Sequence, residues 1–311
     1  MKYVQNKVAE SHIALPVAML YSLVVWLLAG MIQGHWWIQF GFFIISAILM
    51  TQVNNSNVLI RIYSRIISVS FILLSCTTVF LFPSISGAFL GACFITSMFA
   101  LFQSYQNPRA TGWIYYCFLA FGLGSMADIH ILFFLPLYWI LIKFFIYAFS
   151  WRTFVASLLG VLTPYWFLCA WLLIADADSI TWIATHFAAL ADFQYSLADI
   201  TLQQLLFVAL LIILEVTGTI HYLRNDYQDK IRVRQLYYCF IFIWIFAMTL
   251  MVAQPQHYDL CIRIMTVCTS VQIGHFIALT HTKFTNIAFF VILGTILILT
   301  VFNLWTSSLI F

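Results

Sequence analysis

The chain has 311 residues, of which 64% are hydrophobic, 18% aromatic and only 7% charged. A water-soluble globular protein could not cover its surface with so few charges, so most side chains must face lipid. The net charge is only +3 and no nucleic-acid-binding motif is present, so we expect no nucleic-acid partner. The composition therefore indicates an integral membrane protein.

Apolar stretches suited to membrane-spanning helices follow one another along nearly the whole chain. Only helices satisfy every backbone group locally in lipid, so each stretch is predicted to be a helix. The first stretch follows Lys2 and Lys7 as in a signal peptide, but no cleavage site follows it, and we expect it to be retained. The prediction is an all-α, polytopic bundle of about 11 spans in a single integral membrane domain, residues 1–311. The spans are expected at about 13–32, 36–51, 66–82, 85–102, 112–127, 131–149, 153–174, 201–222, 236–253, 264–280 and 284–306.

The stretch 112–149 could form one long helix or a hairpin of two. A single helix would move Arg224 and the basic residues after it to the opposite side of the membrane, so the charge distribution favours two spans that turn at Asp128-Ile129-His130. The first of these two spans is short and contains three glycines, which makes it a candidate for a bent or re-entrant segment.

Basic residues are sorted between the two sides of the predicted membrane. Arg263 is the one basic residue on the outer side, and the other twelve share the inner side, which predicts a cytoplasmic N-terminus. These twelve are Lys2, Lys7, Arg61, Arg65, Arg109, Lys143, Arg152, Arg224, Lys230, Arg232, Arg234 and Lys283. The protein is therefore predicted to be a multi-pass inner-membrane protein with its N-terminus inside.

Two connections between spans are long enough to carry features of their own. The outer loop 175–200 contains an amphipathic stretch, Ile180 to Leu190, which predicts a short interfacial helix. The basic inner loop 223–235 is expected to set orientation and to contact anionic lipids.

Ionisable residues of the outer turns are the main candidates for chemistry. If the bundle brings these turns together, the acids and histidines could perform acid–base catalysis or hold a divalent ion, and an arginine could bind a phosphate. The alternative is that outer loops contain aspartate because they avoid lysine and arginine, and that Arg263 pairs locally with Asp259. The predicted catalytic residues are Asp128, His130, Asp192, His257 and Asp259, and the predicted substrate-binding residues are Arg263 and His186.

Glu215 and His275 are ionisable residues within predicted spans. A lone carboxylate in a membrane is costly, so we predict an intramembrane polar pair that could relay protons. The alternative is a neutral Glu215 hydrogen-bonded to a neighbouring hydroxyl or carbonyl group.

No sequence motif assigns a cofactor or a metal. The histidines show no HxxxH or HxxHH spacing, which argues against a membrane iron oxygenase, and no phosphate-binding loop, hydrolase or dinucleotide-binding motif is present. The seven cysteines form no CxxC pair, and we expect them to be buried apolar residues.

Several short pieces occur in an order that resembles a family of uncharacterised multi-pass membrane proteins of Bacteroidetes. These pieces are Asn54-Asn55-Ser56-Asn57, Leu81-Phe82-Pro83, the stretch Gly122–Asp128, and the run from Trp151-Arg152 to Thr163-Pro164-Tyr165. This resemblance implies a bacterial membrane location and no specific activity. The overall plan is also similar to membrane glycosyltransferases that use polyprenyl-phosphate sugars, although the first outer loop here lacks their acidic residue.

Three classes of function follow from these patterns. The first is an enzyme or binding protein that acts at the outer face on a lipid or lipid-linked envelope substrate. The second is a transporter or flippase that uses Glu215 and His275. The third is a scaffold or assembly partner of another membrane protein. Membrane lipids are expected partners in all three.

Overall fold

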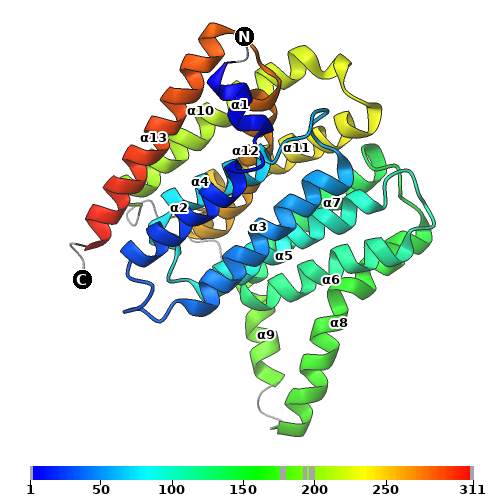
Figure 1. Ribbon diagram of the computed structural model, residues 1–311. Helices are drawn as coiled ribbons and strands as arrows, with labels where there is room; N and C mark the ends of the chain where they lie inside the picture. The colour runs from blue at the N-terminus through cyan, green and yellow to red at the C-terminus, as the bar shows by residue number, and fades with distance from the viewer. Residues whose placement is uncertain (1–2, 176–179, 192–194, 196–199, 309–311) are drawn as a thin grey trace.

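The computed structural model of the chain describes residues 3–175, 180–191, 195 and 200–308 (Figure 1). The predicted site residue Asp192 and the basic residue Lys2 lie outside these ranges. Within them, the regular secondary structure consists of thirteen α-helices with short 3-10 helices between some of them, and no strand occurs there. The predicted all-α class is therefore confirmed.

The α-helices follow one another with short connections. The first seven are α1 (Val4–Glu10), α2 (Ala14–Leu28), α3 (Trp37–Asn57), α4 (Ile66–Thr77), α5 (Ile85–Gln103), α6 (Thr111–Ala127) and α7 (Leu135–Phe144). The others are α8 (Trp151–Ala175), α9 (Ile180–Ala188), α10 (Leu202–Asn225), α11 (Ile231–Ala253), α12 (Tyr258–Leu279) and α13 (Lys283–Ser308). Figure 1 shows the end of α8 and α9 projecting together from the remaining helices.

Seven helical stretches of the described chain are long and apolar enough to cross a bilayer, and α1 with α2 makes an eighth if this pair, bent by 90°, counts as one span. A multi-pass membrane protein is therefore supported, but the predicted count of about eleven is not confirmed by helix length. The difference arises where the chain forms short helices: α4 has 12 residues, α6 has 17 and α7 has 10.

The predicted hairpin at Asp128 is confirmed. Helix α6 ends at Ala127, the 3-10 helix η2 (Ile129–Phe134) follows, and α7 returns alongside α6. The rings of Phe121 and Tyr138 lie 4.4 Å apart, centroid to centroid, and Phe118 also contacts Tyr138. These contacts between residues at similar distances from the turn show that the two segments run antiparallel.

Several helices extend further than the hydrophobic pattern predicts. Helix α3 continues to Asn57, α11 begins at Ile231 and α12 begins at Tyr258. The basic residues Arg232 and Arg234 therefore lie on α11, so the predicted loop 223–235 is much shorter in the structure. The apolar pattern ends at the first polar or charged residues. A helix can continue beyond this point as long as its polar side chains find water or hydrogen-bond partners at the membrane surface.

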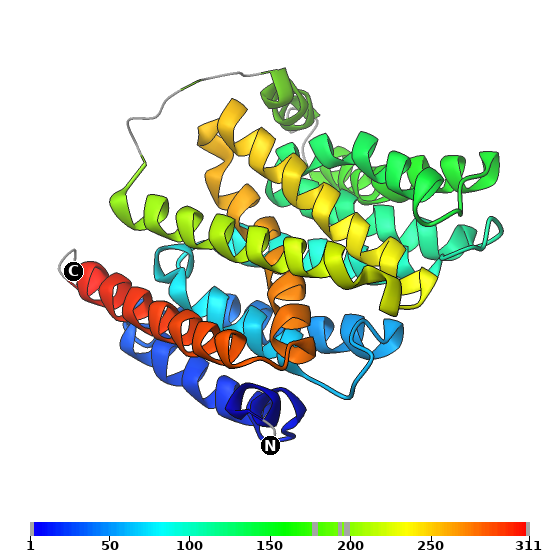
Figure 2. The same ribbon diagram turned by 90° about the horizontal axis from the view of Figure 1, so that it is seen from above.

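Helix α12 lies in the interior of the bundle, in contact with α1, α4, α5, α10 and α11 (Figure 2). In the span Pro255–Leu279, 89% of an apolar stretch of 18 residues is buried by protein, whereas the corresponding share for the span on α13 is 22%. The side chains of α12 therefore face other helices and not lipid.

Helices α10 and α12 run parallel in a constant register. Tyr258 donates a hydrogen bond to the Gln204 carbonyl oxygen, 54 positions earlier in the chain. The contacts of Glu215 with Thr269, of Gly218 with Gln272 and of His221 with His275 have the same offset. Gly218 permits this close packing, because a Cβ atom at this position would lie 2.9 Å from the Gln272 backbone.

The loops that carry the predicted inner basic residues meet at one end of the bundle, called here the basic end. Arg232 donates to the Asn57 side chain over 2.8 Å and to the Phe102 carbonyl oxygen over 3.2 Å. Ser64 donates to the carbonyl oxygen of Ala9 in α1. The structure therefore places loops from distant parts of the chain on the same side, as the charge distribution predicts.

Helices α6 and α8 pack closely through two glycines. A Cβ atom at Gly160 would lie 2.6 Å from the Tyr115 carbonyl oxygen, and one at Gly122 would lie 2.6 Å from the Val161 carbonyl oxygen. Real side chains do not approach backbone atoms so closely, so the two helices could not keep this separation with larger residues.

Gly160→Ala should lower the thermal midpoint of the purified protein, with a cost of about 1–3 kcal/mol for the forced separation of α6 and α8. Gly294→Ala on α13 is the matched control, because its new methyl group meets no atom within 4 Å. We expect this control to be neutral or slightly stabilising. Thermal unfolding in detergent checks both variants, and equal midpoints for the two would contradict the packing argument.

Candidate functional site

Asp128 organises the turn between α6 and η2. Its backbone is extended where α6 ends, and it is the residue that precedes the first turn of η2. One carboxylate oxygen accepts a hydrogen bond from the His130 backbone N–H at 3.0 Å and lies 2.7 Å from the Nδ1 of the His130 ring. An aspartate before a helical turn satisfies a free N–H group in this way, and here it also fixes the imidazole.

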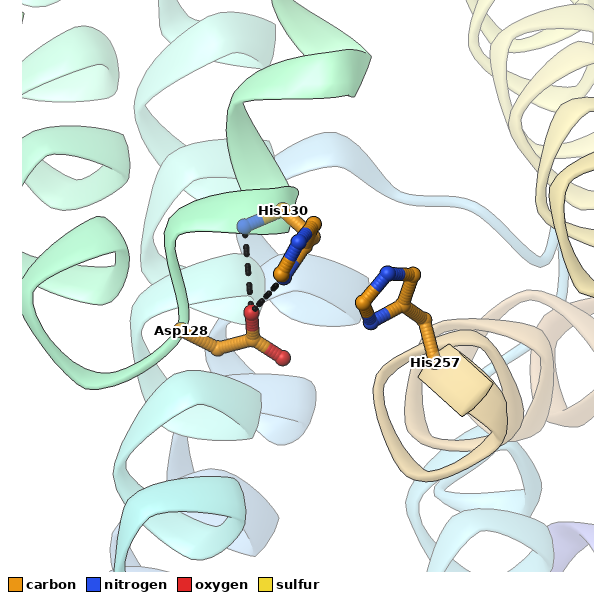
Figure 3. A group of neighbouring side chains, drawn as sticks. All are labelled: Asp128, His130 and His257. Carbon is orange, nitrogen blue, oxygen red and sulfur yellow. Dashed lines mark hydrogen bonds and ion pairs between the residues drawn. The ribbon is translucent and has the colours of Figure 1, made fainter. Parts of the chain in front are cut away.

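His257 reaches the same place from another part of the chain. It ends the 3-10 helix η6 (Pro255–His257), between α11 and α12. Its ring stacks on the His130 ring with 3.5 Å between centroids. One potential ligand atom from each of Asp128, His130 and His257 lies within 4.8 Å of the others, and Figure 3 shows the three side chains pointing toward one another. We call these three residues the Asp128–His130–His257 cluster.

The segment 180–191, formed by α9 and the 3-10 helix η4 (Ala189–Ala191), contacts this cluster at His130. The Nε2 of His186 lies 2.7 Å from the Ser125 carbonyl oxygen, and the Nε2 of His130 lies 3.2 Å from the Ala189 carbonyl oxygen. The helix predicted from Ile180 to Leu190 is therefore present. His186 holds this segment against α6, near the cluster, and is not one of the three grouped ligands.

The contacts of Asp128 favour its charged form. Burial opposes ionisation, but hydrogen bonds from the side chain and backbone of His130, together with the charges of His130 and His257, outweigh burial and hold the pKa of Asp128 below its ordinary value. Both ring nitrogens of His130 face oxygen atoms, so both bonds exist together only when both nitrogens carry protons. The cluster therefore contains a carboxylate held in place by its contacts with His130.

Arg263 and Asp259 lie on the first turns of α12, close to the cluster. The Asp259 carboxylate interacts electrostatically with both Arg263 and Asp128. The guanidinium of Arg263 donates a hydrogen bond of 2.7 Å to the Leu81 carbonyl oxygen. The residues predicted to lie on the outer side, Asp128, His130, His257, Asp259 and Arg263, are thus brought to the same end of the bundle. The sequence predicted their convergence only on the condition that the outer turns meet.

The ligand types of the cluster are those of a transition-metal site. Two imidazoles and one carboxylate are a common set for zinc, and three protein ligands leave a fourth position for water or substrate. In a tetrahedral zinc site with zinc–ligand distances of about 2.0–2.2 Å, neighbouring ligand atoms lie roughly 3.3–3.6 Å apart, so the ligand atoms here, which lie within 4.8 Å of one another, must move closer together. A bound metal would also replace one of the two His130 contacts, because an imidazole binds a metal through an unprotonated ring nitrogen.

The structure places Glu215 and His275 in separate contacts. The Nε2 of His275 lies 3.0 Å from a carboxylate oxygen of Asp229, and both side chains are almost completely buried. Glu215 accepts a hydrogen bond from Thr219 and faces Thr269, which matches the alternative of a carboxyl group bonded to neighbouring hydroxyls. No sequence pattern indicates Asp229 as the partner of His275, because Asp229 belongs to the loop that follows α10 and its position depends on how that loop folds back.

The cysteines agree with the expectation of buried apolar residues. All seven are free thiols; six are buried and Cys169 is half-buried. None belongs to the group of potential metal ligands found among the described residues.

Asp128→Asn should lower the stability of the protein at pH 7 by about 1–2 kcal/mol, because a charged acceptor of two hydrogen bonds is replaced by a neutral one. The pKa of Asp128 is lower in the folded protein, so its contribution is complete above the ordinary aspartate value, about 3.9, and is lost as the pH falls through the folded value. Thermal midpoints of both proteins between pH 3 and 8 should therefore converge only below about pH 4. A difference in thermal midpoint that stays the same at every pH would contradict this role of the Asp128 charge.

Comparisons of the chain with protein-family models, with curated proteins and with solved structures give no match. The resemblance to a Bacteroidetes membrane-protein family and the similarity in plan to polyprenyl-phosphate glycosyltransferases therefore remain predictions. Any function must be argued from the geometry of this site, because a fold alone does not determine an activity.

Proposed function

We propose that this protein binds and processes a lipid-linked substrate at the end of the bundle opposite the basic end, with a divalent metal ion held by the Asp128–His130–His257 cluster. The observation that carries this proposal is the convergence of two separate turns, α6–η2 and α11–α12, on one set of ligand-type side chains. If these acids and histidines were present only because outer loops exclude lysine and arginine, they would have no reason to meet and stack.

The proposed topology places the basic end in the cytoplasm of a bacterium, with the N-terminus inside and the cluster at the outer face of the inner membrane. It contains eleven crossings, in which the short helices α4, α6 and α7 count as spans together with the longer ones. The meeting of the basic loops at one end supports this arrangement. The short spans of α6 and α7 would thin the bilayer locally near Asp128, and this thinning would bring the cluster closer to lipid headgroups.

The proposed chemistry uses the open position of the metal. A zinc ion with three protein ligands can lower the pKa of a bound water molecule to about 7 or can polarise a phosphoryl or carbonyl oxygen. The Asp259 carboxylate interacts electrostatically with Asp128, and Arg263 adds a positive charge at the same end of the bundle. A hydrolysis or transfer reaction on the head of a lipid-linked substrate is the reaction class that these groups support. The segment 180–191, which contacts His130 and Ser125, would limit access of water to the cluster.

His257→Ala and Asp128→Asn should each abolish stoichiometric zinc retention, because two remaining ligands do not hold zinc strongly. His281→Ala is the control, since His281 is exposed and distant in sequence from the cluster. The measurement is the zinc content per protein after zinc loading and removal of free metal. We expect about one zinc ion in the parent and in the control. Full retention by His257→Ala would exclude this site.

A second candidate function, proton-coupled transport, is favoured by the interface of α10 and α12. Glu215, Thr269, Gln272 and His275 are all buried there, and both side-chain polar atoms of Gln272 lack hydrogen-bond partners. Polar groups without partners are costly inside a membrane and usually mark a path for ions or protons. We propose that this interface, which leads to the His275–Asp229 pair, is such a path if the protein is a transporter.

Glu215→Gln should reduce proton flux at least tenfold in liposomes that contain the purified protein, because an amide cannot release a proton. A pH-sensitive dye inside the liposomes measures this flux under an imposed pH gradient. Thr249→Val, which changes an exposed hydroxyl on α11, is the control and should leave the flux unchanged. The transport candidate is rejected if the parent protein shows no flux above that of empty liposomes.

A further inference from the structure

A cavity with both polar and aromatic walls lies beside Arg263, among α2, α3, α4, α5 and α12. The space open to the centre of a water-sized sphere is about 70 Å³. About 10–15 Å³ of such space is enough for one water molecule, so the cavity has room for a group of several heavy atoms. Its polar lining comes from Gln39 and Ser46 of α3, from Ser75 of α4 and Thr78 next to it, and from Arg263.

The guanidinium of Arg263 has few partners for a buried cation. Its one hydrogen bond in the structure is to the Leu81 carbonyl oxygen, and its Nε is buried without a partner. The side chain lies against Gly87, where a Cβ atom would be 2.6 Å from Nε. Asp259 acts on it electrostatically, but Asp259 also lies close to the carboxylate of Asp128. The positive charge is therefore only partly compensated.

The helices around Arg263 increase this positive potential. Gly87 lies in the first turn of α5, and Arg263 lies near the start of α12. The first turn of a helix carries a partial positive charge, which disfavours a cation and favours an anion. The first turn of α5 therefore favours a bound anion beside Arg263, and in a membrane this preference is stronger because water screens the charges less.

We propose that this cavity binds a phosphate group, with the guanidinium of Arg263 as its main contact and the hydroxyl groups of Ser46 and Ser75 as further donors. This proposal rests on the proposed function and specifies its substrate class. A guanidinium binds phosphate or carboxylate through two parallel hydrogen bonds. The additional donors come from different helices around the cavity, and this arrangement suits the three terminal oxygens of a phosphate better than the two oxygens of a planar carboxylate.

Two sources of phosphate share this chemistry: the head of a lipid phosphate and free inorganic phosphate. The aromatic walls formed by Trp26, Phe43 and Phe71 suit the apolar part of a lipid phosphate. The test therefore uses three probes: dodecyl phosphate, inorganic phosphate and dodecanoate, a carboxylate with a chain of similar length.

The experiment measures the affinity of each probe by titration calorimetry for the full chain in a neutral detergent with a chelator present. We expect saturable binding of dodecyl phosphate, weakened at least tenfold by Arg263→Gln. Arg109→Gln, which removes an exposed arginine, is the matched control and should bind as the parent does. Equal Arg263-dependent binding of inorganic phosphate would support the phosphate site and identify a free source.

Gly87→Ala provides a second variant if Arg263→Gln fails to fold. It keeps the charge but places a methyl group against the guanidinium, and it should also weaken binding of dodecyl phosphate. Binding that neither variant changes, no binding of either phosphate, or tighter binding of dodecanoate would overturn the proposal. Because the chelator removes metal, these results do not depend on the Asp128–His130–His257 cluster. Zinc retention without phosphate binding would reject this inference alone, and the reverse result would reject the metal site alone.

Discussion

Helix α12 is enclosed by other helices along most of its length, and this enclosure determines which side chains it can carry. A helix that faced lipid could not hold Arg263, Gln272 and His275 without bringing polar groups into hydrocarbon. Because α12 contacts protein on nearly all sides, Arg263 bonds to the Leu81 carbonyl oxygen and His275 to Asp229, while Gln272 is enclosed against α10. The candidate cluster at one end of the molecule and the buried polar interface with α10 both depend on this central position.

The parallel register of α10 and α12 extends this arrangement along the bundle. Contacts with the same offset occur from Gln204–Tyr258 to His221–His275, so one alignment positions the polar groups at both ends. Gly218 allows the close approach at Gln272. A shift of one helix along the other would separate Glu215 from Thr269 and His221 from His275 together, which links the two ends of the interface through backbone packing.

The Asp128–His130–His257 cluster lies where two turns meet. Asp128 and His130 are close in sequence, and their hydrogen bonds are a local property of the turn. His257 is brought to them because α11, which precedes η6, packs against η2 through Phe246 and Phe134, and the segment 180–191 contacts His130 through the Ala189 carbonyl oxygen. A three-ligand site here depends on this meeting, because the α6–η2 turn supplies only Asp128 and His130.

The sequence by itself determined the helical class, the solvent, the sorting of charge, the hairpin at Asp128 and the helix near Ile180 to Leu190. Each follows from local rules: apolar length, the exclusion of basic residues from one side, and the turn-forming side chain of Asp128. The sequence also selected Asp128, His130, His257 and Arg263 as candidates, since charged residues are rare enough here to be considered one by one.

The sequence could not determine the ends of α3, α11 and α12, because the apolar pattern ends before the helix does. Tertiary structure alone decided that His257 stacks on His130, that His275 pairs with Asp229 and not with Glu215, and that Arg263 borders a polar cavity. The physical reason is that apolar length alone is enough to predict that a helix crosses a bilayer. The order and register of the helices depend on close contacts such as Gly218 with Gln272, which no local sequence pattern contains.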